Sequence, residues 1–138
     1  MILLRRVIVP KSTAQLDIRL KRAYEPSATS DGTRILIDRL WPRGVTKEEA
    51  AIDHWFRDIA PTTELRKWFG HDPKLWAEFQ RRYTAELKHH AEQLDELLQL
   101  AHKGPITLVF GARDEEHNDA VVLKQVLLKR SKRRVSDR

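Results

Sequence analysis

Two short runs of apolar residues constrain most strongly what this chain of 138 residues can fold into. Ile35-Leu36-Ile37 lies within the segment from Arg34 to Leu40, and Ile106 to Phe110 forms the second run. Neither run alternates with polar residues, as is typical of strands whose two faces are both covered by protein. Helical patterns separate the runs, and strands that alternate with helices form parallel sheets. The sequence therefore predicts a small α/β domain with a largely parallel sheet flanked by helices.

Periodicity and capping signals predict the remaining elements. Residues 16–24 alternate apolar and charged side chains, which predicts a half-exposed strand. A capping box over residues 46–49 predicts the start of a helix. Residues 52–60 fit either a continuation of that helix or a strand. Further helices are expected over residues 63–69, over residues 72–103 with a break near residues 89–90, and over residues 119–128.

Composition and charge limit the chemistry and the partners of the chain. There is no cysteine, which excludes disulfides, thiol nucleophiles and thiolate metal sites. The formal net charge is +6, and residues 129–138 contain six basic side chains, so the rest of the chain is close to neutral. A basic tail of this kind either follows the phosphates of a nucleic acid or is a frayed, solubilising end. We favour the frayed end.

The organisation of the chain follows from these patterns. We expect an N-terminal extension over residues 1–15, a single domain over residues 16–128 and the basic tail over residues 129–138. Residues 1–9 are interrupted by two arginines and are too short for a spanning helix or a signal peptide. No later segment is expected to cross a bilayer. The sequence therefore predicts a cytoplasmic protein that does not bind membranes, and it leaves the oligomeric state open.

Two predicted strands end in loops, at residues 38–44 and 111–118, that are rich in charged side chains. Ligands of open α/β sheets bind beyond the carboxyl ends of the strands, so neighbouring parallel strands would bring both loops to one edge. Guanidinium groups suit phosphate or carboxylate, an indole offers a flat face, and the start of a helix favours an anion. We therefore expect a pocket for an anionic and plausibly planar molecule. The candidate ligand-binding residues are Asp38, Arg39, Trp41, Arg43, Arg113 and Asn118.

Asp114 and His117 are the candidate catalytic residues, because a histidine titrates near neutral pH and either side chain can transfer a proton. Structural interpretations stay open beside the functional ones. Asp38 can form a salt bridge with an arginine, Asp114 can cap the final helix, and Trp41 can belong to the core. No metal site is predicted, because the histidines lack the helical spacing of a zinc motif. No Gly-rich phosphate loop or nucleophile elbow identifies a cofactor or a reaction.

Three functional hypotheses are compatible with these residues. The first is an enzyme that acts on a nucleotide, a nucleic acid or another phosphate-bearing molecule, with Asp114 or His117 transferring a proton. The second is a non-catalytic module that binds or senses an anionic metabolite or nucleic acid in the same pocket. The third is nucleic-acid binding through the basic tail alone, without any pocket.

Three motifs occur in order along the chain, at residues 39–44, 60–72 and 112–118. Together they resemble the YeaO-like bacterial proteins, a family of unknown function, and the similarity covers residues 16–128. The resemblance implies a compact Rossmann-like α/β domain, a strand within residues 52–60 and a site formed by the three motifs. A related branch has cysteines in the loop that matches residues 111–118, so a thiol role there does not transfer to this chain. Some relatives carry a tetrapyrrole methyltransferase label, yet this chain has no Gly-rich loop for a methyl donor.

Overall fold

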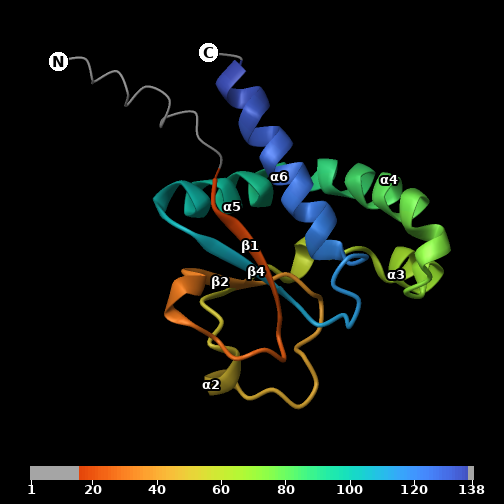
Figure 1. Ribbon diagram of the computed structural model, residues 1–138. Helices are drawn as coiled ribbons and strands as arrows, with labels where there is room; N and C mark the ends of the chain where they lie inside the picture. Colours follow the sequence, from red (N-terminus) through yellow and green to blue (C-terminus); the bar gives the residue numbers. More distant parts are fainter. Residues whose placement is uncertain (1–15, 137–138) are drawn as a thin grey trace.

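The computed structural model describes residues 16–136, with side chains described as far as Arg133. Four strands form one sheet in the order β1-β4-β2-β3 (Figure 1). Their bounds are Ile18–Arg22 for β1, Thr33–Leu36 for β2, His54–Trp55 for β3 and Ile106–Phe110 for β4. All three pairings are parallel. The predicted α/β fold with a parallel sheet flanked by helices is therefore confirmed.

The helices lie close to where their sequence signals predict them. The α-helices are α2 (Lys47–Ala50), α3 (Thr63–Phe69), α4 (Trp76–Leu87), α5 (Ala91–Lys103) and α6 (Asp119–Ser136). Short 3-10 turns are η1 (Thr29–Asp31), η2 (Arg57–Ile59), η3 (Pro73–Leu75) and η4 (Lys88–His90). The capping box is confirmed, because the Thr46 hydroxyl accepts from the Glu49 N–H at 3.1 Å and the Glu49 carboxylate accepts from the Thr46 N–H at 3.0 Å. The expected break in the long helical segment is η4, which includes the predicted residues 89–90.

The two faces of the sheet are buried against different parts of the chain. Ile35 and Leu108 belong to the large core that α4, α5 and α6 complete. Leu36 and Val109, their neighbours along the strands, belong to a smaller core on the other face, which Trp41 helps to cover. All four strand residues have no exposed surface. Uninterrupted apolar runs are therefore explained by burial on both faces, as predicted.

Residues 52–60 form neither a continued helix nor a full strand. Ala51 adopts a left-handed conformation with φ of 47°, which ends α2 after little more than one turn. The chain then pairs with β2 only over the two residues of β3 and turns into η2. The strand implied by the family resemblance is therefore present but short, and the helical alternative is wrong.

Helix α6 continues well past its predicted end at residue 128. It reaches Ser136, and Arg130 Nε donates to Asp95 Oδ1 on α5 at 2.9 Å. The interpretation of the basic tail as a frayed end is therefore wrong for residues 129–136. No glycine or proline interrupts this segment, and arginine and lysine are good helix formers that also favour a helix C-terminus. Within residues 16–136, no helix is long and apolar enough to cross a membrane. The predicted N-terminal extension lies outside the described residues.

Candidate functional site

The carboxyl ends of β2 and β4 lie side by side. Leu36 pairs with Val109 in parallel, so the loops that follow both strands share one edge of the sheet, as predicted. The Gly111 N–H bridges them by donating to Asp38 Oδ2 at 2.8 Å. After β2 the chain continues to the face of the sheet that α2 covers, where Arg34 Nε donates to the Ala50 carbonyl. After β4 it continues to the opposite face, which α6 covers. Strand ends that diverge in this way leave the crevice in which α/β proteins bind ligands.

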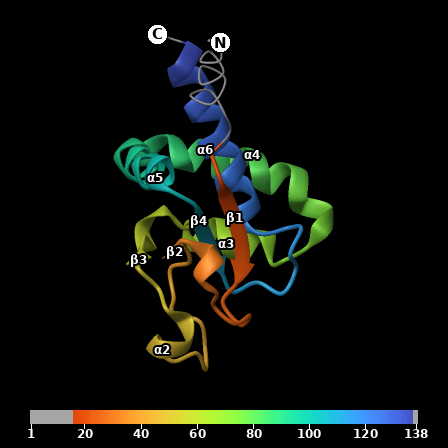
Figure 2. The ribbon, with the colours of Figure 1, turned by 60° about the vertical axis from the view of Figure 1, so that its left-hand side comes forward.

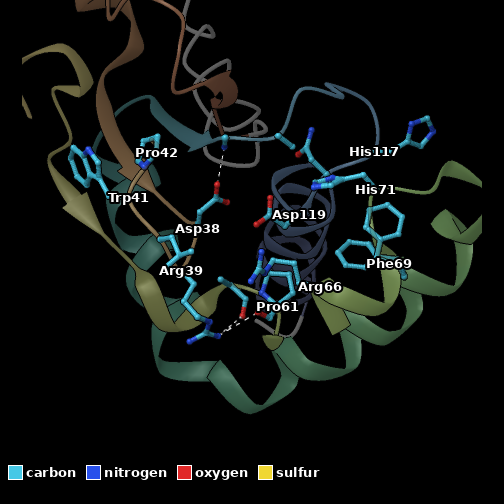
Figure 3. A pocket seen from close by; sticks show the side chains of 16 residues that line it. Asp38, Arg39, Trp41, Pro42, Pro61, Arg66, Phe69, His71, His117 and Asp119 are labelled. Carbon is cyan, nitrogen blue, oxygen red and sulfur yellow. Dashed lines mark hydrogen bonds between the residues drawn. The ribbon is translucent and has the colours of Figure 1, made fainter. Parts of the chain in front are cut away.

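A cavity of about 280 Å³ occupies this crevice (Figure 3). The first loop contributes residues 38–42, and the loop after β4 contributes residues 111, 112 and 117–119. The segment between η2 and η3 adds Ala60, Pro61, Arg66, Phe69 and His71, and α4 adds Phe79. Four of the sixteen lining residues are prolines or phenylalanines, and seven are polar or charged.

Two carboxyl groups form the floor of the cavity. Figure 3 shows the side chains of Asp38 and Asp119 facing each other. Burial raises the pKa of Asp38 and raises the pKa of Asp119 well above the ordinary range of an aspartate. Two adjacent, half-buried carboxylates repel each other, which favours a proton shared between them. The Gly111 N–H stabilises the ionised form of Asp38.

Cationic side chains surround the carboxyl pair (Figure 3). Arg39 Nη2 donates to the carbonyl oxygens of Ala60 and Pro61 at 3.3 and 3.4 Å. Arg39 Nε is buried without a hydrogen-bond partner among the described residues. Arg66 is exposed on α3 and forms no ion pair within residues 16–133. Two guanidinium groups therefore lie in the same cavity as the carboxyl pair.

His71 lies in a strained backbone conformation at the edge of the cavity. Its φ is 58°, in the left-handed region, directly after Gly70, which ends α3 with φ of 53°. Its ring packs on Phe69 with centroids 6.2 Å apart, and its proximity lowers the pKa of Asp38. Left-handed residues other than glycine are uncommon and cost stability, and they cluster at functional sites. The strain at His71 thus coincides with the cavity.

The two candidate catalytic residues contact each other. His117 Nδ1 lies 2.8 Å from Asp114 Oδ2, and the N–H groups of Glu116 and His117 donate to Asp114 Oδ1 at 2.9 and 3.0 Å. The Glu116 N–H bond and the His117 ring lower the pKa of Asp114. Asp114 does not cap α6, because Asn118 Oδ1 accepts from the Val121 N–H at 3.1 Å. Asp114 instead orders the loop and holds the imidazole of His117.

The structure brings together some of the predicted site residues and separates others. The residues that line the cavity are Asp38, Arg39, Trp41, His117 and Asn118, whereas Arg43, Arg113 and Asp114 do not line it. The Arg43 side chain is exposed, and Arg113 is exposed as well. The indole of Trp41 also has a structural role. Its Nε1 donates to the Val45 carbonyl at 2.7 Å, and its ring packs edge-on against Trp55.

Three residues that the sequence analysis did not name individually as candidates line this cavity. Asp119 was expected only as the first residue of a helix, where acidic residues are common. Arg66 and His71 both lie in the motif at residues 60–72, which is the signal that could have identified them. Among residues 16–136, no group of three or more histidine, cysteine or acidic side chains could hold a metal ion.

Comparison with known proteins gives one family. Residues 17–138 match the family model DUF488-N3i, described as the inactive DUF488-N3 subclade. The uncharacterized protein YeaO of Escherichia coli (strain K12) is 44% identical over 108 residues, which cover 78% of this chain and 94% of the relative. An uncharacterized protein of Mycobacterium tuberculosis (strain ATCC 25618 / H37Rv) is 39% identical over 110 residues, covering 80% of this chain and 92% of the relative. No solved structure matches the chain.

Proposed function

This chain belongs to the DUF488-N3i family, described as an inactive subclade, and from that premise we propose that it is a non-catalytic binding module for a small anionic ligand. The resemblance to the YeaO-like proteins is confirmed by the identity of 44% over most of both chains. The family description favours binding without turnover over the enzymatic hypothesis. The ligand site we propose is the cavity between the ends of β2 and β4.

The observation that carries this proposal is the meeting of two carboxyls with raised pKa values, Asp38 and Asp119, and two guanidinium groups in one cavity. A pair whose one proton is shared between its own oxygens presents only acceptors to a ligand, and it repels an anion. Uncharged hydroxyl or amide groups are therefore its best partners. Arg39 and Arg66 suit an anionic group at the other end of the same ligand. The ligand we propose is thus polar and uncharged at one end and anionic at the other.

The size and walls of the cavity narrow the ligand further. A volume of about 280 Å³ is at the lower limit of ligand pockets, which favours a small metabolite. The rings of Phe69, Phe79 and Pro61 offer flat apolar surfaces, against which a sugar ring or a heterocycle can pack. A phosphorylated sugar or a nucleoside monophosphate has this size and this distribution of charge.

The test is thermal unfolding of the full chain with inorganic phosphate, ribose 5-phosphate or AMP. A ligand at a hundred times its dissociation constant stabilises the fold by about 2.7 kcal/mol. We expect ribose 5-phosphate or AMP to raise the melting temperature of the wild type, with a much smaller effect of inorganic phosphate. Arg66→Ala should abolish the increase. Lys67→Ala should retain it, because this exposed neighbour on α3 has the same charge but does not line the cavity.

Two results would contradict the binding proposal. One is an equal increase in Arg66→Ala and Lys67→Ala, which would mean that the anion binds outside the cavity. The other is the absence of any increase with all three compounds. The recovered ligand should be chemically unchanged after prolonged incubation with the protein.

A second candidate function is proton transfer by Asp114 and His117, and one observation favours it. A carboxylate that holds an imidazole nitrogen at 2.8 Å is a common arrangement for a general base, and His117 lines the cavity. If the recovered ligand is chemically altered by wild type but not by His117→Ala, the chain is an enzyme. In that case the non-catalytic proposal is wrong.

A further inference from the structure

Helix α6 presents a basic face near its C-terminus. Lys129, Lys132 and Arg133 are exposed, and their spacing of three and four residues puts them on one side of the helix. Leu123 and Leu127 are fully buried and lie on the opposite side, against the large core. In Figures 1 and 2 the C-terminal part of α6 extends beyond α4 and α5. The basic face therefore projects from the body of the domain.

The charge on this part of α6 is of one sign only. From Ala120 to Ser136 the helix contains no aspartate or glutamate. Arg130 is neutralised by Asp95 at 2.9 Å, which also fixes the helix against α5. Within residues 16–133, no ion pair neutralises Lys129, Lys132 or Arg133. Three unpaired cations thus extend along a rigid helix.

We propose that the face formed by Lys129, Lys132 and Arg133 binds the phosphate backbone of a nucleic acid duplex. An isolated small anion would find no enclosed site there, because the three side chains are exposed and spread along the helix. A polyanion with regularly spaced charges contacts all three at once and releases bound counterions. The partner is therefore recognised by its repeated phosphates, without sequence preference.

The same face lacks what a membrane surface requires. An interfacial helix inserts large apolar side chains between lipid headgroups. Among residues 119–133 of α6, the exposed ones are Gln125, Lys129, Lys132 and Arg133, and the leucines at positions 123 and 127 are buried. Charge complementarity without an apolar contribution favours the duplex over an anionic bilayer.

This surface is separate from the ligand cavity. Asp119 is the first residue of α6 and lines the cavity, whereas Arg133 lies fourteen residues further along the helix. At 1.5 Å per residue the two are about 21 Å apart. Variants on the basic face therefore leave the cavity intact, and duplex binding does not depend on the ligand proposal.

The experiment is fluorescence anisotropy of a labelled DNA duplex of about 20 base pairs, titrated with the full chain. Wild type is compared with a variant carrying Lys129→Gln, Lys132→Gln and Arg133→Gln. The control carries Lys47→Gln, Lys67→Gln and Lys74→Gln, which removes the same charge from exposed positions on α2, α3 and η3. Glutamine is a good helix former, and circular dichroism verifies that α6 is retained. Vesicles containing phosphatidylserine are titrated in parallel.

We expect the basic-face variant to bind the duplex at least tenfold more weakly at 50 mM salt, with the control within twofold of wild type. Three phosphate contacts give a slope of about 2.7 in log affinity against log salt, hence a loss of about 40-fold between 50 and 200 mM for wild type. For the basic-face variant, the affinity for the duplex should depend little on the salt concentration. Equal weakening of both variants, unchanged binding by the basic-face variant, or tighter binding to vesicles than to the duplex would overturn the proposal.

Discussion

Replacing Asp119 by asparagine tests the proton that this residue shares with Asp38. In the wild type, burial raises the pKa of Asp119 in the folded state well above its value of about 3.9 in the unfolded chain. The folded protein therefore holds a proton that the unfolded chain has released. The stability due to this proton is fully present below pH 4 and is lost as the pH rises through the raised pKa. Asparagine keeps a donor to Asp38 and has no proton to lose.

The magnitude follows from the number of protons. Where the folded state holds one proton more than the unfolded state, the free energy of unfolding falls by about 1.4 kcal/mol for each unit of pH. Across two units this amounts to about 2.7 kcal/mol, a large part of the 5–15 kcal/mol that stabilises an ordinary domain. The difference in stability between Asp119→Asn and the wild type should therefore grow with pH and then become constant above the raised pKa.

Urea unfolding followed by tryptophan fluorescence, at intervals from pH 5 to pH 9, measures this difference. Titrating groups outside the pair contribute equally to both proteins and cancel, so the difference reports the pair of Asp38 and Asp119. Asp58→Asn is the matched control, because this carboxylate is exposed on η2 and forms no hydrogen bond or ion pair among the described residues. Its difference from wild type should not change with pH. If the curves of Asp119→Asn and wild type are parallel throughout, the two carboxyls share no proton and the polarity assigned to the cavity is wrong.

Four further substitutions test the backbone and the core. His71→Gly should leave the stability of the fold unchanged or raise it by up to about 1 kcal/mol, because the φ of 58° at this position suits glycine. Ligand binding should be lost. A clear loss of stability would contradict backbone strain at His71. Gly32→Ala should lower the free energy of unfolding by about 3 kcal/mol, because the new Cβ would lie 2.1 Å from the Pro105 carbonyl oxygen. Gly44→Ala should lower it by only about 1 kcal/mol, because Gly44 has a φ of 79° but no neighbour within 4 Å. Equal costs in urea unfolding would refute the steric explanation. Tyr83→Phe removes a buried hydrogen bond of 2.7 Å to a backbone carbonyl of η2 and should cost about 1–2 kcal/mol in the same assay.

The fold class and the edge that carries the cavity could be predicted from local patterns in the sequence. Ile35-Leu36-Ile37 and Ile106 to Phe110 lack polar alternation because both faces of these strands are buried. Capping at Thr46 is equally local, since it depends on side chains three residues apart. Parallel neighbouring strands then bring the two polar loops together as a general consequence of α/β geometry. These predictions needed no knowledge of distant contacts.

Which residues line the cavity was decided only by the tertiary structure. Asp38 and Asp119 are far apart in sequence, and they meet because β4 is inserted between β1 and β2 and α6 returns across the helical face. No local pattern distinguishes Asp119 from an ordinary acid at the start of a helix. Arg66 reaches the cavity, whereas Arg43 and Arg113 do not, because the direction of a loop side chain depends on long-range packing. The sequence by itself therefore determined the scaffold and the sign of the charges, and the packing of distant segments determined which charges meet.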